Sequence, residues 1–133
     1  MKFLFTILLT SLIFPSKIMD YTLNEIKSVF ELGAGSGEYL DVFKLIGSET
    51  YGIEGSLKLA TKARNAGHSV YDGFLPETDL TRKIGNKTFD LVTSFNFIEH
   101  LPDPLSSLRV LVKTLKPGGN AILEVPNFDI SCS

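Results

Sequence analysis

The sequence predicts an α/β domain built on a doubly wound, mainly parallel β-sheet of about five strands. Short apolar runs alternate with segments of helical periodicity from residue 26 onward. A glycine cluster follows the first apolar run, and polar residues follow the later ones. Because parallel neighbours need helical crossovers, this alternation is typical of a sheet with helices on both faces.

The first strand is expected over residues 28–32, an apolar run that ends at the glycine cluster. A helix should follow over residues 37–46, since its apolar positions fall near one helical face. Those positions are Tyr39, Leu40, Phe43 and Ile46. The second strand is expected over residues 50–54.

The middle of the chain continues this pattern. Ser56 is a candidate N-cap for a helix that runs to Asn65, and Gly67 is a stop signal for it. His68 then reads as an exposed turn residue before a third strand over residues 69–72. A loop with a short helix is expected over residues 75–84.

The last two strands are separated by the best-marked helix. The fourth strand is expected over residues 89–94, and Pro104 suits the first position of a helix over 104–115. Pro117-Gly118-Gly119 predicts a turn, and the fifth strand should cover residues 121–125.

Composition narrows the classes of partner and compartment. The 133-residue chain has 13 basic and 15 acidic residues, a net charge of −2, so no nucleic-acid partner is expected. Cys132 is the single cysteine, which excludes an internal disulfide and fits a reducing, cytoplasmic location. With two histidines besides, a structural zinc site is implausible.

The N-terminal residues 1–25 form a separate apolar segment in this interpretation. Residues 3–14 are apolar but shorter than the roughly 20 residues that span a bilayer. They resemble the core of a signal peptide, yet no small-residue cleavage pattern follows, so secretion is the minority interpretation. The domain is expected over residues 26–128, with a tail over 129–133.

The glycine loop is the first candidate site. Gly33, Gly35 and Gly37 allow a sharp turn and leave room for a ligand against the backbone. A dinucleotide loop would carry its third glycine at position 38, which here is Glu38, a poor neighbour for a pyrophosphate. Glu31, two residues before the first glycine, suits a ligand with ammonium groups. A glycine-rich turn without a ligand is the alternative.

Two further stretches carry polar groups at expected strand ends. Glu54 ends the second strand about twenty residues after the glycine loop, where a carboxylate can accept both hydroxyls of a ribose. Dehydrogenases share this feature, so Glu54 supports an adenosine ligand without choosing a cofactor. Asn96, Glu99 and His100 follow the fourth strand and should face the crevice at the carboxyl ends of the strands.

Six motifs in this order resemble the class I S-adenosylmethionine-dependent methyltransferases, nearest the ubiquinone-biosynthesis-type O-methyltransferase branch. The motifs are Glu31 to Gly37, Gly52-Ile53-Glu54, Phe89-Asp90-Leu91-Val92, Glu99-His100-Leu101-Pro102-Asp103-Pro104, Leu115-Lys116-Pro117-Gly118-Gly119 and Glu124-Val125-Pro126-Asn127. The resemblance covers about residues 26–128. It implies a Rossmann-like sheet of order 3-2-1-4-5, which lacks the last strands of the full family fold.

The resemblance assigns cofactor-binding roles residue by residue. The loop that holds the methionine part matches Glu31, Gly33, Ala34, Gly35 and Gly37. The ribose position matches Glu54, with Gly55 beside it, and the adenine region matches Asp72, Gly73 and Phe74. Many relatives carry an acidic residue at position 74, where this chain has Phe74, a ring that could cover the base instead. The segment beneath the cofactor matches Ser94, Phe95 and Asn96.

The catalytic assignment stays open. His100 is a candidate general base and Glu99 could orient it, but both residues could equally belong to a structural loop that Asp103 and the prolines cap and stiffen. The structural interpretation is favoured. Relatives proposed to use a metal tend to carry a carboxylate at the position of Asn96, so no metal is expected.

The family fold continues past the fifth strand with a helix and two more strands, whereas the resemblance in this sequence stops after the fifth strand. The edge of residues 121–125 would then be exposed and prone to self-association or to pairing with a partner chain. A small-molecule methyl acceptor is the expected partner, with oxygen as a candidate acceptor atom. The alternative is a catalytically silent cofactor-binding or interaction module. A nicotinamide-dependent oxidoreductase ranks third because of Glu38.

Overall fold

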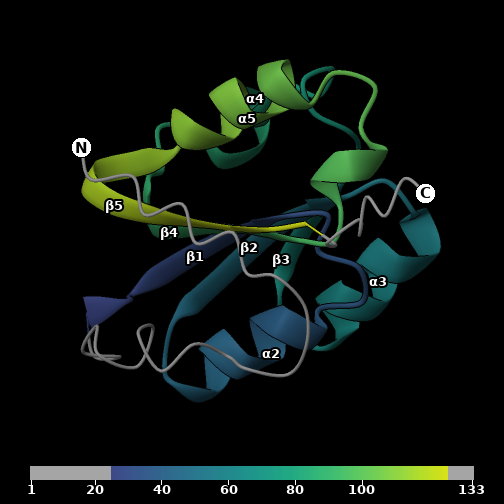
Figure 1. The fold of residues 1–133 in the computed structure, drawn as a ribbon. Coiled ribbons are helices and arrows are strands. Elements are labelled where there is room, and N and C mark those ends of the chain that lie inside the picture. The colour runs from purple at the N-terminus through teal and green to yellow at the C-terminus, as the bar shows by residue number, and fades with distance from the viewer. Residues whose placement is uncertain (1–24, 126–133) are drawn as a thin grey trace, which may run out of the picture.

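A computed structural model describes residues 25–125 and places a five-stranded parallel sheet between two layers of helices (Figure 1). The strand order is β3-β2-β1-β4-β5. The strands are β1 (Ser28–Leu32), β2 (Glu49–Glu54), β3 (Ser69–Asp72), β4 (Phe89–Phe95) and β5 (Leu115–Glu124). The predicted fold class and strand order are confirmed. The apolar segment before residue 25, Cys132 and the predicted tail lie outside the described residues.

The helices lie on both faces of the sheet, with α2 and α3 on one face and α4 and α5 on the other (Figure 1). They are α2 (Glu38–Leu45), α3 (Leu57–Asn65), α4 (Leu80–Ile84) and α5 (Pro104–Val112), with a 3₁₀ turn, η2 (Ile98–His100). Ser56 caps α3 as predicted, accepting the Leu59 N–H at 3.3 Å. Asp103 caps α5 in the same way through the Ser106 N–H.

Side-chain alternation along the buried strands divides the core into two clusters. Val29 of β1 packs with Leu40 and Phe43 of α2, while the next residue, Phe30, packs with Leu111 of α5. Successive strand residues point to opposite faces, so a strand buried on both faces reads as a continuous apolar run. The five residues of β1 are all buried. This strand therefore holds the glycine loop, which follows it, in a fixed place.

The turn predicted at Pro117-Gly118-Gly119 lies inside β5 as a bulge and does not precede the strand, and the predicted extension of the fourth helix to residue 115 is wrong. α5 ends at Val112, and β5 already begins at Leu115. Pairing runs from Phe89↔Leu115 to Leu91↔Asn120, so residues 116–119 bulge out opposite Asp90. Proline and glycine do not end the strand here because ladder pairing with β4 resumes on the other side of the bulge.

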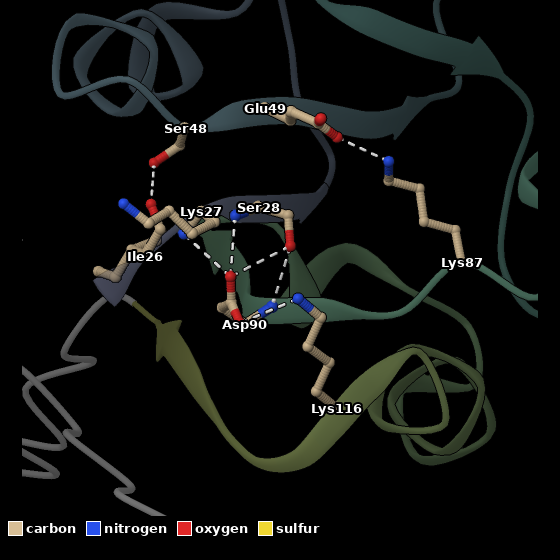
Figure 2. Close-up of polar contacts among 8 residues, drawn as sticks. All are labelled: Ile26, Lys27, Ser28, Ser48, Glu49, Lys87, Asp90 and Lys116. Atoms are coloured by element: carbon tan, nitrogen blue, oxygen red, sulfur yellow. Dashed lines mark hydrogen bonds and ion pairs between the residues drawn. The ribbon is translucent and has the colours of Figure 1, made fainter. Parts of the chain in front are cut away.

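The amino-terminal edge of the sheet is closed by polar contacts around Asp90 (Figure 2). Asp90 Oδ2 accepts the backbone N–H groups of Lys27 at 2.9 Å and Ser28 at 3.1 Å, and Oδ1 lies 3.2 Å from Lys116 Nζ. Burial alone would raise the Asp90 pKa, but the Lys27 amide and the Lys116 ammonium lower it overall. Asp90 thereby ties β1, β4 and β5 together at this end.

Candidate functional site

The structure brings the predicted cofactor-binding residues to one edge of the sheet. Each group follows or ends one of four adjacent strands: Glu31, Gly33, Ala34, Gly35 and Gly37 belong to β1 and its loop, Glu54 and Gly55 to β2, Asp72, Gly73 and Phe74 to β3, and Ser94, Phe95 and Asn96 to β4. Since the four strands are parallel neighbours, their carboxyl ends meet along the same edge. Polar contacts join the groups to one another, as follows.

The glycine loop is fixed by backbone bonds to β2. The N–H groups of Gly33 and Ala34 both donate to the Ile53 carbonyl, at 2.9 and 3.1 Å. Gly33 has φ +74°, and a Cβ at this position would collide with the Phe97 ring. A side chain is therefore excluded on both conformational and steric grounds. The loop lies tightly against the end of β2 and against the segment that follows β4.

Glu54 joins the loops that follow three strands. Its Oε1 accepts the Gly35 N–H at 3.0 Å, and its Oε2 accepts the Ser56 N–H at 2.8 Å. Its backbone carbonyl accepts the Gly73 N–H at 3.0 Å. A carboxylate has about four accepting positions. Glu54 can therefore hold the glycine loop and still accept hydroxyl donors from a ligand.

Glu31 is the most unusual group at this edge. Glu31 is 1% exposed, and within residues 25–125 neither of its carboxylate oxygens has a hydrogen-bond partner. Burial, followed by the charges of Glu38 and Glu54, raises the Glu31 pKa well above its ordinary value. A buried carboxyl group without a partner is costly. The site is therefore suited to a ligand that brings a cation or a donor to Glu31.

The residues after β3 present an aromatic ring to solvent beside Glu54. The Phe74 side chain is 56% exposed, and its ring lies where a Cβ at Gly55 would stand. The Phe74 N–H donates to Thr78 Oγ1 at 3.0 Å, which holds this segment in place. The Asp72 carboxylate lies 3.5 Å from the Arg64 guanidinium of α3. The exposed face of the Phe74 ring is available for stacking on a flat ligand.

The end of β4 combines an aromatic stack with a residue in an uncommon backbone conformation. Phe95 stacks on Tyr39 of α2, with ring centroids 4.1 Å apart, and Ser94 Oγ donates to the Leu32 carbonyl. Asn96 has φ +49°, and its Nδ2 donates to Glu124 Oε1 at 3.0 Å. Non-glycine residues with positive φ are uncommon and gather at functional sites. Asn96 thus connects the ends of β4 and β5.

Glu99 and His100 lie next to this edge, in η2. The Glu99 side chain is 13% exposed, and its oxygens have no hydrogen-bond partner in the described part of the chain. His100 Nε2 lies 3.4 Å from Glu99 Oε1, but the two atoms do not form a hydrogen bond. The His100 side chain is 74% exposed. The contact permits either the acid–base or the structural role.

Several residues of this region were missed or misread from the sequence. His68 is not an exposed turn residue but is 4% exposed, and it bonds to Thr50 and Asp41. Phe97, which contacts Gly33, was missed, and Glu124, which contacts Asn96, was predicted only as part of the fifth strand and of a family motif. The available signals were that Phe97 directly follows the predicted site residue Asn96 and that Glu124 lies near the carboxyl end of the predicted fifth strand.

The described residues also limit two other kinds of site. No three His, Cys, Asp or Glu side chains between residues 25 and 125 are grouped so that they could hold a metal ion. In the same range, no helix has the length and apolar character needed to cross a membrane.

Comparison with known proteins gives consistent matches over this chain. The family model described as "Methyltransferase domain" matches residues 10–131. The ubiquinone biosynthesis O-methyltransferase of Aliivibrio fischeri (strain MJ11) is 30% identical over 109 residues, which are 78% of this chain and 46% of that protein. The chain spans about half the length of the curated relatives that it matches.

Two solved structures share the fold at lower identity. Streptomyces venezuelae DesVI superimposes with a TM-score of 0.71 and 24% identity, covering 89% of this chain and 52% of DesVI. S-adenosylmethionine-bound CalS10, an amino pentose methyltransferase from Micromonospora echinaspora involved in calicheamicin biosynthesis, gives a TM-score of 0.69 and 20% identity, covering 90% of this chain and 60% of CalS10.

Proposed function

The chain belongs to the methyltransferase-domain family, and from this premise we propose that it binds S-adenosylmethionine at the carboxyl ends of β1 to β4 and serves methyl transfer to a small-molecule acceptor. The observation that carries the proposal is Glu31. S-adenosylmethionine has an ammonium group and a sulfonium, an adenine and a ribose with two hydroxyls. A buried carboxyl group without a partner among the described residues, beside a glycine loop, fits the ammonium.

The remaining groups at this edge fit the rest of the same ligand. The positive φ of Gly33, Gly35 and Gly37 lets the loop turn sharply, and at Gly35, where no side chain lies nearer than 3.5 Å to a Cβ position, it leaves space for the methionine part. Glu54 has accepting positions left for the ribose hydroxyls, and the exposed Phe74 ring would cover the adenine in place of the acidic residue of many relatives. Ala34, Gly55, Asp72, Gly73, Ser94, Phe95 and Asn96 complete the proposed cofactor site.

The chemistry asks this chain for positioning more than for covalent catalysis. When bound, S-adenosylmethionine supplies an activated methyl electrophile. The protein's contribution is to hold an acceptor in line and to exclude water. For an oxygen acceptor, which the name of the Aliivibrio relative supports, His100 would take the proton and Glu99 would orient the imidazole.

The proposal also covers the cellular compartment and association with other chains. We place the activity in the cytoplasm, where the cofactor is made. Of the strands described between residues 25 and 125, β5 pairs with β4 alone, so its second edge is available to a strand from a second copy or from another chain. Analytical ultracentrifugation over a range of concentrations measures self-association directly.

Calorimetry with S-adenosylhomocysteine and with NAD tests the cofactor assignment. We expect the chain to bind the homocysteine compound and not NAD. Glu31→Gln should weaken binding about 10- to 100-fold, because a hydrogen bond to a charged group contributes about 1.5–3 kcal/mol. The matched control is Glu49→Gln, at the opposite end of β2, where Glu49 pairs with Lys87 in solvent. This control should bind like the wild type.

Two results would contradict the proposal. Failure of the wild type to bind S-adenosylhomocysteine would overturn the cofactor assignment, and equal binding by Glu31→Gln would remove its main support. Binding without methylation of a panel of phenolic, alcohol and amine acceptors would favour the catalytically silent module instead.

A further inference from the structure

Two buried side chains, His68 and Thr50, and the half-exposed carboxylate of Asp41 form a continuous hydrogen-bonded chain beneath the glycine loop. His68 Nε2 lies 2.6 Å from Asp41 Oδ1 of α2, and His68 Nδ1 lies 2.6 Å from Thr50 Oγ1 of β2. The His68 side chain is 0% exposed, and Thr50 is 6% exposed. These bonds span 27 and 18 residues of sequence, so they connect α2, β2 and the start of β3.

The arrangement resembles a hydroxyl–imidazole–carboxylate triad, but the burial of Thr50 excludes a nucleophilic role for its hydroxyl. A nucleophile must reach a substrate atom at hydrogen-bond distance. Thr50 is 6% exposed in β2, where it pairs with the buried Val29 of β1, so its hydroxyl is enclosed in the core. The Thr50 hydroxyl therefore serves to join the elements around it.

The His68 ring lies directly against the last glycine of the loop. Gly37 has φ +93°, and a Cβ there would stand 2.7 Å from His68 Cδ2 and 3.1 Å from Nε2. Asp41, which His68 binds, lies in the first turn of α2, and its N–H donates to the Gly37 carbonyl at 2.8 Å. One imidazole thus contacts the end of the loop and holds the first turn of the helix that follows it.

Apolar packing alone leaves the position of α2 along its axis less well defined. Leu40 and Phe43 bury one face of the helix against the sheet, but hydrophobic contact has no preferred direction. The bond between His68 and Asp41 is directional, and an ionised acceptor makes it stronger than a neutral one. Backbone bonds to Ile53 and the Glu54 carboxylate hold the start of the loop, so the bond to Asp41 is the directional contact at its other end, where the loop enters the first turn of α2.

We propose that His68 is a positioning residue for the glycine loop, acting through its bond to Asp41, and that the affinity of the loop for its ligand depends on this bond. The ligand part of this inference rests on the proposed function. The imidazole donates from Nε2 to the Asp41 carboxylate, while Nδ1 accepts the Thr50 hydroxyl. The ring touches no ligand in this role.

Two amide substitutions separate the two bonds of the ring. In His68→Gln the terminal amide reaches as far as Nε2, so the bond to Asp41 is retained. In His68→Asn the shorter side chain reaches only as far as Nδ1, so the bond to Thr50 is retained and the bond to Asp41 is lost. Asp41→Ala removes the same bond from the other side.

Hydrogen–deuterium exchange without any ligand measures the position of the loop directly. We expect the amides of Gly37 and Asp41 to exchange about tenfold faster in His68→Asn and Asp41→Ala, the effect of losing about 1.4 kcal/mol of local stability. His68→Gln should exchange like the wild type. The dissociation constant of S-adenosylhomocysteine should follow the same order, rising about tenfold in the first two variants.

Thr114→Val is the control for a general loss of stability. The Thr114 hydroxyl makes a buried bond to the Leu111 carbonyl on the far side of the sheet, so this variant should lower Tm without faster exchange at Gly37. If His68→Asn lowers Tm as Thr114→Val does and leaves exchange at Gly37 and Asp41 unchanged, His68 merely fills the core and the inference is overturned. Equal exchange in His68→Gln and His68→Asn would also overturn it.

The ligand arm separates this inference from the proposed function. If the exchange rates differ as expected but the wild type does not bind S-adenosylhomocysteine, the cofactor assignment fails and the positioning role stands. If the wild type binds and His68→Asn binds equally well, the cofactor assignment stands and the positioning role fails.

Discussion

Carboxyl groups lie at both ends of the central strands, in opposite environments. At the amino-terminal edge, Asp90 accepts from two backbone amides and an ammonium group, and the neighbouring Glu49 pairs with Lys87 (Figure 2). At the carboxyl-terminal edge, Glu31 accepts from no group in the described range, although it is the more deeply buried. The pKa of Asp90 is lowered and that of Glu31 is raised.

This difference separates groups that stabilise the fold from groups that wait for a ligand. A satisfied carboxylate contributes to stability, whereas an unsatisfied buried one subtracts from it and persists where function needs it. Glu31 lies in β1 and Asp90 lies in β4, and these two strands pair with each other, so the strands themselves do not explain the difference. The following experiments compare the two edges, from the largest expected effect to the smallest.

The largest contrast is between two glycines with positive φ at opposite edges. Gly33 (φ +74°) and Gly47 (φ +90°) both disfavour a side chain, but only a Cβ at Gly33 meets another group, the Phe97 ring. We expect Gly47→Ala to cost about 1–2 kcal/mol of unfolding free energy, and Gly33→Ala to cost about 3 kcal/mol or more from conformation and overpacking together. Urea denaturation measures both.

A smaller change at Gly33→Ala than at Gly47→Ala would mean that the Phe97 ring moves away freely. The carboxyl-terminal edge would then be looser than its contacts indicate. Gly33→Ala combined with Phe97→Ala should recover part of the loss, because the collision is removed while the cost of the backbone conformation stays.

The second contrast is in pH dependence, where the two carboxyl groups should act with opposite sign. The Glu31 pKa is raised above 4.5 in the folded state, so its contribution is fully present below pH 4.5 and is lost as pH rises through the higher folded value. The Asp90 pKa is lowered below 3.8, so its contribution is present above pH 3.8 and is lost as pH falls through the lower folded value.

Glu31→Gln and Asp90→Asn test this by urea denaturation between pH 3 and pH 9. Glu31→Gln should gain on the wild type as pH rises, by about 1–3 kcal/mol, because the amide cannot ionise in the core. Asp90→Asn should lose about 1–2 kcal/mol at neutral pH, and the loss should shrink in acid. Parallel curves of unfolding free energy against pH for Glu31→Gln and the wild type would contradict this prediction, because Glu31 would then add no pH dependence to stability.

The strands and the glycine loop were predictable because their signals are local. Residues 28–32 form an apolar run that ends in glycines, and the strand is where that pattern places it. The roles of His68 and Glu124 were not, because their partners are 27 and 28 residues away in sequence. The early start of β5 has the same origin, since Leu115 joins the strand by pairing with Phe89 of β4, before the local turn signal at Pro117-Gly118-Gly119. The strand order came from the family resemblance and not from any local pattern.

The smallest expected effect concerns the Phe74 ring, which covers Gly55 at the carboxyl-terminal edge. Because the side chain is 56% exposed, Phe74→Ala should change Tm little, as should the control Leu105→Ala, a 58% exposed residue on α5. Phe74→Ala should nevertheless weaken S-adenosylhomocysteine binding about 3- to 10-fold if the ring stacks on the adenine, whereas Leu105→Ala should not.

Gly55→Ala tests whether the Phe74 ring acts on ligand binding through its position over Gly55. Alone, it should displace the Phe74 ring and weaken binding as Phe74→Ala does. In the double variant the collision is gone, so the two effects should not add, and the coupling energy measures how far the ring acts through its place over Gly55. Additive losses would show that Gly55 contacts the ligand by itself. Binding by Phe74→Ala equal to that of the wild type would instead show that the ring, like the Leu105 side chain on α5, does not contact the ligand.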